Sequence, residues 1–532
     1  MNTLARAPPA LTHRVLSSAE GFCRPRRVAE NKPTTERVAV MRKSTSVRGI
    51  TTLAACALAL AALADASSAR AGTLKVTTLN DSGPGSLRQA IGDASPGDTI
   101  TFDVKGTITL TSGALMIDKS LDIQGPGPGK LKISGNDTSR VFVIASGTVT
   151  MAGMTIAEGR ADANSPILPC NGGGVLIGGQ SVKLGPASLT LSHAVVSDNQ
   201  ALGDASKTPS GYPGGGGGGG VANLGTLTVT ASSFIGNLAR AGDGSSGPPI
   251  AGAGSGGGIL NFGGKLTVSS STFSHNQVIG GNECDGPIQS GIAIGGAIAS
   301  AGVLVVSGSG FDHNQAIGGN GNEITSPDPG DLGPNRASGG AIDLFGAGMA
   351  MIDGCTLEHN QALGGAGASG ANGGVGTGGG IVASGVTSQG VPVHATIMNC
   401  WVEHNTALGG LGGSGGDGGE GVGGGLGSIS GATLTVISTT VDLNDARGGE
   451  GGTGGNGGNG LGGGFYENAT GTLTLEGATV SFNLALGGEA EDGGSGGQGI
   501  GGGVYRLGIF TFDSATVIAK NHATTSNDNI WP

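Results

Sequence analysis

The stretch from Gly256 to Asn276 reads GGGILNFGGKLTVSSSTFSHN and contains every part of a repeat that recurs along the chain. A triplet of small residues precedes an apolar residue, and a short alternating run, LTV, follows. An apolar residue three positions before an asparagine then closes the unit. The same order returns in GGAIASAGVLVVSGSGFDHN, from Gly295 to Asn314. Self-similarity at a regular period indicates a repeat architecture, so the chain is best read in these units.

The closing asparagine marks the end of each unit and recurs at intervals of 38 to 46 residues. Each unit offers about three short strands and cannot bury its apolar side alone, whereas stacked units can. We therefore predict an all-β, right-handed parallel β-helix with one coil per unit, because parallel crossovers are overwhelmingly right-handed. A β-propeller is the rival, but its blades need four strands each. The closing asparagines are Asn199, Asn237, Asn276, Asn314, Asn360, Asn405, Asn444, Asn483 and Asn521.

Glycine-rich inserts lie between each asparagine and the next small-residue triplet, and glycine supplies 113 of the 532 residues. In the last units the inserts barely vary in length and repeat the pattern G-G-x. Three residues per turn is the period of the polyproline-II helix, which glycine can adopt. This period predicts an ordered lateral layer of extended glycine strands, and a fringe of mobile loops is the alternative.

The part of the chain before the inserts reads as the start of the same solenoid. Residues 72–170 alternate with period two between glycine turns, which predicts coils without inserts, and residues 171–532 hold the glycine-rich coils. Gly85–Ala94 predicts a short amphipathic helix with Ser86 as its N-cap. Such a helix would cover the open edge of the first coil.

The front of the chain has the features of a targeting segment. Residues 41–71 combine a basic start, an apolar run too short to span a bilayer and the A-x-A sequence Ala69-Arg70-Ala71. This pattern predicts a secretory signal peptide, and a lipoprotein cleavage before Cys56 is the alternative. Residues 1–40 then form an unstructured upstream extension, with the start codon open between Met1 and Met41. We expect an exported protein, either extracellular or on the outer cell surface.

The charge of the chain narrows the class of partner. The net charge is −11, and residues 1–71 hold eleven of the 27 basic residues but only four of the 38 acidic ones. The remainder is therefore strongly acidic, which argues against nucleic acid and anionic membranes as partners. No second apolar run is long enough to span a bilayer, so we predict no transmembrane segment in the mature chain.

Two rows of titratable residues follow from the repeat. One position after the apolar marker, successive units carry acids, and the next position carries histidines. Neighbouring rungs of about 4.8 Å would stack these side chains, and carboxylates and imidazoles can together hold a divalent cation. A solvated face copied by duplication is the structural alternative, and we expect no other cofactor. The acids are Asp312, Glu358, Glu403 and Asp442, and the histidines are His275, His313, His359 and His404.

Two further rows are expected to be structural. The stacked asparagines predict a ladder of amides bonded along the axis. Five positions before each asparagine lies a small residue. This indicates a row of inward-pointing side chains at a place where no larger side chain fits. Cys355 and Cys400 occupy this row in adjacent units, so they form either a disulfide, as an exported protein allows, or two buried thiols.

At this point the residues carry a resemblance. The pairing of GG[AG][ILV] with FxxN, as in GGGILN with FSHN, resembles the repeat of the polymorphic outer membrane proteins, and Leu79–Phe102 resembles the N-terminal part of secreted β-helix proteins of that type. The resemblance implies a secreted or surface-displayed pectin-lyase-like β-helix, adhesin-like in some relatives. The G-G-x inserts are similar to those of mycobacterial PGRS proteins in composition and period.

These observations favour a structural or adhesin-like protein that binds glycan, matrix or other cell surfaces without catalysis, so an enzyme is not the leading prediction. The rivals are a carbohydrate-active β-helix enzyme, either a polysaccharide lyase or a glycoside hydrolase, and a self-associating surface-layer component. Few basic residues lie in the central units, and Lys265, Arg336 and Arg447 all lie outside the acidic row. A polysaccharide lyase would require an arginine or lysine as a base beside its carboxylates.

Overall fold

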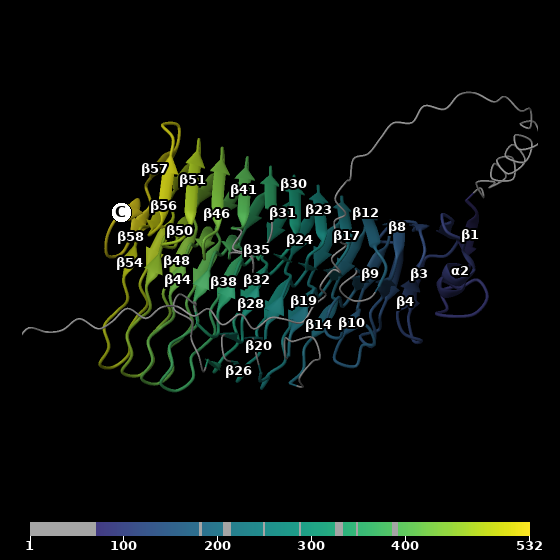
Figure 1. Cartoon of the computed structure of the whole chain (residues 1–532), viewed down its shortest axis with the longest axis horizontal. Coiled ribbons are helices and arrows are strands. Elements are labelled where there is room, and N and C mark those ends of the chain that lie inside the picture. The colour runs from purple at the N-terminus through teal and green to yellow at the C-terminus, as the bar shows by residue number, and fades with distance from the viewer. Residues whose placement is uncertain are drawn as a thin grey trace, which may run out of the picture. The chain divides into compact units, whose positions relative to one another are not determined.

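The computed structural model describes residues 71–179, 184–205, 214–247, 250–286, 289–324, 333–346, 349–385 and 392–531. In the unit from Arg70 to Pro532 these residues form a right-handed parallel β-helix, seen in Figure 1 as rows of parallel arrows. The predicted extension 1–40 and, apart from residue 71, the predicted signal peptide lie outside the described residues. Among the described residues, no helix is long and apolar enough to cross a membrane.

Each complete coil passes through five sheets in the order C, A, B, D and E. The sequence predicted about three strands per unit, and these are the strands of sheets C, A and B. Sheets D and E were missed because sheet E strands have only two residues, and sheet D strands bury a single small side chain, usually alanine, in place of the large apolar residues of sheets A and B. Every strand pair between neighbouring coils is parallel, and the register keeps like residues in line, as for Leu227 and Leu266 or Phe234 and Phe273.

Sheet A carries the alternating run, and its inward side chains, such as Leu227 and Val229, are fully buried. Its strands are β1 (Thr73–Val76), β2 (Thr99–Phe102), β5 (Leu121–Gln124), β8 (Gly147–Ala152), β12 (Ala187–Ser192), β17 (Thr226–Thr230), β23 (Lys265–Ser269), β30 (Val303–Ser307), β36 (Met349–Asp353), β41 (His394–Met398), β46 (Thr433–Ile437), β51 (Thr472–Glu476) and β56 (Ile509–Phe512).

Sheet B carries the apolar residue of the apolar-x-x-Asn motif, which points inward. Phe234, Phe273 and Phe311 stack there with ring centroids 4.8 and 4.9 Å apart. Its strands are β3 (Gly106–Thr109), β6 (Leu131–Ser134), β9 (Thr155–Ala157), β13 (Val195–Ser197), β18 (Ser233–Ile235), β24 (Thr272–Ser274), β31 (Gly310–Asp312), β37 (Thr356–Glu358), β42 (Trp401–Glu403), β47 (Thr440–Asp442), β52 (Thr479–Ser481) and β57 (Val517–Ala519).

Sheet C follows the small-residue triplet, and its first residue, such as Ile259 or Ile298, completes the main core with sheets A and B. Its strands are β4 (Leu115–Ile117), β7 (Phe142–Ile144), β11 (Val175–Ile177), β16 (Val221–Asn223), β22 (Ile259–Asn261), β29 (Ile298–Ser300), β35 (Ile342–Phe345), β40 (Ile381–Ser384), β45 (Leu426–Ile429), β50 (Phe465–Glu467), β55 (Val504–Arg506) and β59 (Ile530–Trp531).

Sheets D and E pack closely because alanine and glycine fill the space between them. A Cβ on Gly376 of sheet E would lie 2.2 Å from the Leu408 carbonyl oxygen of sheet D. The strands of sheet D are β10 (Arg160–Ala161), β14 (Gln200–Leu202), β19 (Leu238–Arg240), β25 (Gln277–Ile279), β32 (Gln315–Ile317), β38 (Gln361–Leu363), β43 (Thr406–Leu408), β48 (Asp445–Arg447), β53 (Leu484–Leu486) and β58 (His522–Ala523). Those of sheet E are β15 (Gly216–Gly217), β21 (Gly254–Ser255), β28 (Ala293–Ile294), β34 (Ala337–Ser338), β39 (Gly376–Thr377), β44 (Gly421–Val422), β49 (Gly460–Leu461) and β54 (Gly499–Ile500). Two small pairs lie in the inserts, β20 (Ile250–Ala251) with β27 (Gln289–Ser290) and β26 (Asp285–Gly286) with β33 (Glu323–Ile324).

The first coil is covered by the helix α2 (Leu87–Asp93), which lies at the purple end of the solenoid in Figure 1. The Ser86 side chain caps the helix by accepting a hydrogen bond from the Gln89 backbone N–H, 3.1 Å away. Leu87 and Ile91 are buried against the first coils. The helix therefore seals apolar surface that the first coil would otherwise expose.

The closing asparagines form a continuous chain of side-chain hydrogen bonds inside the corner between sheets B and D. From Asn199 to Asn521, each Nδ2 donates to the Oδ1 of the next asparagine at 2.9 Å. Each Nδ2 from Asn237 onward also donates to a backbone carbonyl of the preceding coil, as Asn360 does to Phe311 at 3.0 Å. These amides are almost fully buried, so the ladder satisfies polar groups that would be costly to leave unpaired.

The later inserts form an ordered layer with a period of three residues. We call the inserts 364–376, 409–421, 448–460 and 487–499 the glycine layer, whose loops lie side by side along the lower edge of the solenoid in Figure 1. Every third residue from Gly409 to Gly421 donates its N–H to every third carbonyl from Arg447 to Asn459, at 2.8 to 2.9 Å. Within one insert the outgoing and returning arms are also bonded, as Gly419 is to Gly410 at 2.8 Å.

Replacing one member of the asparagine ladder should strongly destabilise the protein. Asn360→Ala removes the side-chain donor to the Phe311 carbonyl and the acceptor of both the Asn314 backbone N–H and the Asn314 Nδ2, while Asn405 Oδ1 loses one of its two donors and keeps the Asn360 backbone N–H. Because each orphaned buried group costs about 1–3 kcal/mol, we expect a loss of at least about 2 kcal/mol in unfolding free energy by urea titration.

The matched control is the next residue. Gln361 accepts a hydrogen bond from Gln315 at 2.8 Å in an outer ladder that is only partly buried. Water can replace that bond, so Gln361→Ala should cost less than about 1 kcal/mol. Equal losses in the two variants would contradict a special role for the buried ladder.

Within the glycine layer, added methyl groups should be tolerated according to position. A Cβ at Gly410 would lie 2.0 Å from the Gly365 carbonyl oxygen, whereas at Gly415 nothing lies within 4 Å and φ is +80°. Gly415→Ala should cost about 1–2 kcal/mol for its left-handed backbone alone. Gly410→Ala should cost more and should speed amide exchange across 409–421, because the arms must separate. Unprotected amides throughout 409–421 in the wild-type protein would contradict the ordered layer.

Candidate functional site

The predicted histidine row lies at the outer corner between sheets B and D, directly before the buried asparagines. At this corner the backbone must turn each asparagine inward, so the preceding residue takes a left-handed conformation, with φ from 53° to 55° at His275, His313, His359 and His404. Histidine is among the residues that tolerate this region better than most. The corner also holds Leu443 and Phe482 in later coils, so the fold and not the residue type imposes the conformation.

The four imidazoles form a continuous parallel stack. Their ring centroids are 5.2, 4.8 and 5.1 Å apart, and the planes of neighbouring rings differ by at most 12°. The backbone N–H of each histidine donates to the carbonyl of the acidic residue one coil further on, as His313 does to Glu358 at 3.2 Å. This bonding holds each ring at the height of its rung.

The acidic row lies on the outer face of sheet B, one position before the stack. The strand register places Asp312, Glu358, Glu403 and Asp442 in line in four successive coils. Trp401 begins the same strand as Glu403 and is 55% exposed, which makes it the large apolar side chain beside this row. The four acids are half-buried and reach solvent on the outer face of the sheet, and none of them lines the groove described below.

One carboxylate reaches the histidine stack. Oδ1 of Asp312 lies 2.6 Å from Nδ1 of His313 and 3.6 Å from Nδ1 of His359. Of the predicted candidates, Asp312, His313 and His359 are thus brought together, with all three potential ligand atoms within 4.8 Å of one another. Among the described residues no such group includes Glu358, Glu403, His275 or His404.

The two stacked cysteines are free thiols in the structure and not the disulfide that the sequence left open. Both belong to the inward row of small residues, where a hydroxyl or thiol donates to the carbonyl two residues earlier. Ser309 donates in this way to Ser307 at 2.9 Å, and Cys400 to Met398 at 3.0 Å. The Cys400 sulfur also accepts the Cys355 backbone N–H at 3.3 Å. Each thiol therefore replaces a serine in the ladder. Cys170 and Cys284, in separate inserts, are also free and buried.

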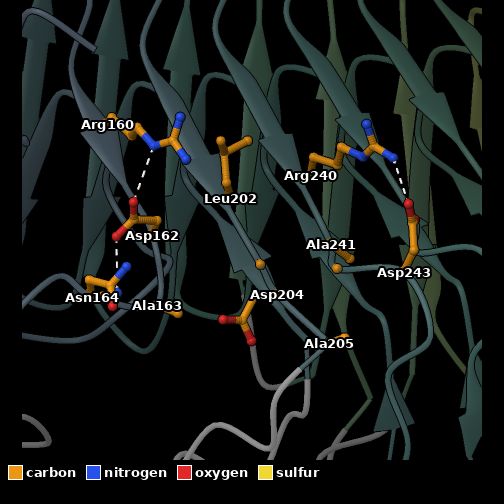
Figure 2. A pocket seen from close by; sticks show the side chains of 12 residues that line it. Arg160, Asp162, Ala163, Asn164, Leu202, Asp204, Ala205, Arg240, Ala241 and Asp243 are labelled. Atoms are coloured by element: carbon orange, nitrogen blue, oxygen red, sulfur yellow. Dashed lines mark hydrogen bonds and ion pairs between the residues drawn. The ribbon is translucent and has the colours of Figure 1, made fainter. Parts of the chain in front are cut away.

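A groove that the sequence did not predict lies where sheet D passes into the early inserts. It has a volume of about 390 Å³ and is open to solvent. Figure 2 shows Arg160 and Arg240 at its two sides, Leu202 between them, and Asp162, Asp204 and Asp243 below. Arg160 Nε lies 3.2 Å from Asp162, and an Arg240 terminal nitrogen lies 2.9 Å from Asp243.

The groove is held in place by neighbouring coils. Asp243 Oδ1 accepts both the backbone and side-chain N–H groups of Asn282, at 2.9 and 3.0 Å, while Oδ2 faces Arg240. Asp162 accepts the Asn164 backbone N–H at 3.0 Å. The charged side chains are thus already oriented before any ligand arrives. Sequence reasoning missed this site because Arg160 faces Gln200 across its strand pair and Arg240 faces Leu202 and Ile279, so neither arginine recurs in an adjacent coil.

A second feature that the sequence did not reveal is a carboxyl group sealed inside the solenoid. Glu467 ends β50 and is fully buried; among the described residues its oxygens make no well-aligned hydrogen bond, and the Leu473 backbone lies near enough to favour the charged form. Burial raises the pKa of Glu467 from its usual 4.5 to about 8. Because no solvent reaches the group, we assign it to stability and not to a reaction.

Solved structures resemble this chain only at the level of the fold. A mannuronic-acid-specific polysaccharide family 6 lyase from human gut microbiota is 11% identical with a TM-score of 0.31, over 84% of this chain and 83% of that one. A pectate lyase is 11% identical with a TM-score of 0.23, over 87% and 80%. Tailspike protein 3 of bacteriophage CBA120 is 11% identical with a TM-score of 0.26, over 81% and 57%. No family model and no curated protein matches the chain. The resemblance to polymorphic outer membrane proteins therefore stays a prediction.

The buried Glu467 predicts a pH dependence of stability. Its pKa is raised in the folded protein, so the stability tied to its proton is present below pH 4.5 and is lost as the pH rises through about 8. Between these values the wild-type protein should lose unfolding free energy relative to Glu467→Gln, which carries no titrating proton. Urea titrations across this range measure the difference. Glu476→Gln, at the exposed end of β51, is the control and should follow the wild-type curve. Parallel curves for wild type and Glu467→Gln would contradict the raised pKa.

Proposed function

We propose that this protein is an exported, non-enzymatic β-helix that binds a neutral polysaccharide chain in the groove between Arg160 and Arg240. One observation carries the proposal: two arginines, each already oriented by an aspartate, flank Leu202 in an open groove. Predicted export through residues 41–71 would bring this groove to extracellular glycans, as an adhesive or matrix-binding role requires.

The chemistry of the groove suits sugar hydroxyl groups. A sugar hydroxyl both donates and accepts hydrogen bonds. Each arginine–aspartate pair of the groove places guanidinium donors beside carboxylate acceptors. Leu202 and Ala163, which are partly exposed, supply apolar contact for the C–H faces of a sugar ring. Because Asp162 and Asp243 are held by backbone and asparagine N–H groups, little side-chain freedom is lost on binding.

The balance of charge favours a neutral chain over an acidic one. Asp162 and Asp243 already pair with the two arginines of the groove. Neither guanidinium group is therefore an unmatched cation that a polyuronate or sulfated chain could neutralise. The net charge of the whole protein, −11, opposes such a ligand further.

The spacing favours a polymer over a single sugar. Arg160 and Arg240 belong to coils two rungs apart, which places their strands about 9.6 Å apart at about 4.8 Å per rung. This span exceeds one sugar ring, so both arginines act together only on adjoining rings of a chain that runs along the solenoid.

A carbohydrate-active enzyme is the second candidate, and one observation favours it. Glu358 and Glu403 face each other across adjacent strands, which lie about 4.8 Å apart. Retaining glycosidases hold their two carboxyl groups about 5–5.5 Å apart. Against this candidate, neither glutamate lines the groove, and both lie half-buried on the outer face of sheet B.

The test measures binding and cleavage together. The purified full-length protein is incubated with neutral and acidic polysaccharides, and both retention and newly formed chain ends are recorded. We expect retention on neutral chains without new ends. Arg160→Ala and Arg240→Ala should each weaken binding by about tenfold, as expected for the loss of a charge-assisted hydrogen bond.

Arg447→Ala is the matched control, because Arg447 occupies the same row of sheet D as Arg240 and is also paired with an aspartate, Asp445, but lies outside the groove. Its binding should equal that of the wild type. New chain ends that vanish in Glu358→Gln or Glu403→Gln but persist in Asp442→Asn would establish the enzyme instead. Stronger binding to acidic chains would contradict the groove as the site.

A further inference from the structure

The histidine stack and the acidic row meet at one point. Oδ1 of Asp312 lies 2.6 Å from Nδ1 of His313 and 3.6 Å from Nδ1 of His359, so one carboxylate oxygen lies close to two imidazoles from adjacent coils. The three side chains are 47% to 51% exposed. An ion could therefore reach them from solvent, and water could complete its coordination.

The ligand set selects the class of ion. Two imidazoles and one carboxylate suit Zn²⁺, Cu²⁺ and Ni²⁺, whereas Ca²⁺ and Mg²⁺ require mainly oxygen ligands. The rings of His313 and His359 lie 4.8 Å apart, so their nitrogens must approach each other to bind at about 2.0–2.1 Å. Half-exposed side chains can rotate toward one another in this way, because solvent and not packed core lies on their outer side.

The sequence of the coils explains why the site forms only here. An acid precedes the stacked histidine in three coils, but it is Asp312 before His313 and a glutamate before His359 and His404. The short aspartate side chain turns back onto the stack. Among the described residues, ion pairs to the four stacked histidines come from Asp312 alone. The repeat thus supplies the imidazoles, and one departure from the repeat supplies the third ligand.

We propose that Asp312, His313 and His359 bind one divalent transition-metal ion of the Zn²⁺ class on the outer surface of the solenoid. The ion holds the corners of two adjacent coils together and keeps further coordination positions open toward solvent. This site is independent of the proposed glycan groove, whose lining contains none of these residues.

Isothermal titration of the full-length protein with Zn²⁺ tests the proposal. We expect saturable binding of one ion, with Cu²⁺ tighter than Ni²⁺ by the Irving–Williams order, and no heat with Ca²⁺. His313→Ala, His359→Ala and Asp312→Asn should each weaken Zn²⁺ binding by at least about tenfold. With Cu²⁺, electron paramagnetic resonance should show coupling to two nitrogens in the wild type and to one in either histidine variant.

Two controls separate this site from other histidines. His275→Ala removes a member of the same stack that lies outside the cluster, and His522→Ala removes a solitary histidine 3.4 Å from Asp528. Both should bind Zn²⁺ like the wild type. The proposal is wrong if no saturable binding occurs, if the three cluster variants bind like the controls, or if Ca²⁺ binds equally well. Circular dichroism of each variant confirms that its fold is retained.

Discussion

The asparagine ladder is the constraint on which the rest of this structure depends. A buried amide must be hydrogen-bonded, and here its partner is the same amide one coil away. Asn276 and Asn314 are 38 residues apart, Asn314 and Asn360 are 46 apart, and both pairs are joined at 2.9 Å. The corner therefore keeps its spacing, while coil length varies in the inserts and in the turn between sheets C and A, as between β40 (Ile381–Ser384) and β41 (His394–Met398). Because each asparagine turns inward, the residue before it is forced outward in a left-handed conformation, and this is how the histidines come to be displayed.

The glycine layer obeys the same spacing without side chains. Its arms bond to the next insert at every third residue, while the strands of the solenoid bond to the next coil at their own registers. Only glycine permits this approach, since a Cβ at Gly449 would lie 2.0 Å from the Gly410 carbonyl oxygen. A loop that is rigid for this reason needs no apolar core of its own. The three-residue sequence repeat of the inserts is thus a structural requirement, although glycine-rich segments are usually interpreted as flexible.

The sequence predicted those parts of the fold that repeat with a strong signal. The alternating LTV runs, the apolar-x-x-Asn motif and the capping helix correspond to sheets A and B and to α2, because buried and exposed positions differ sharply there. Sheets D and E could not be predicted because both residues of a sheet E strand such as Gly376–Thr377 are buried, while a sheet D strand such as Gln361–Leu363 buries only its central alanine. The groove could not be predicted for a different reason. Arg160 and Arg240 occupy different positions of the repeat, and only the stacking of three coils brings them close together.

In a solenoid built by repetition, the departures from the repeat are the best guide to specific sites. A row that is copied in every coil has a sufficient explanation in the stacking itself, as the asparagines and the inward serines and thiols show. Asp312 next to His313, Trp401 among threonines, and the arginines beside Leu202 have no such explanation, since their neighbours in the same rows differ. Each interrupts a ladder at an exposed position, where substitution costs the fold little. Residues that the fold neither requires nor copies are therefore those for which a ligand is the more economical explanation.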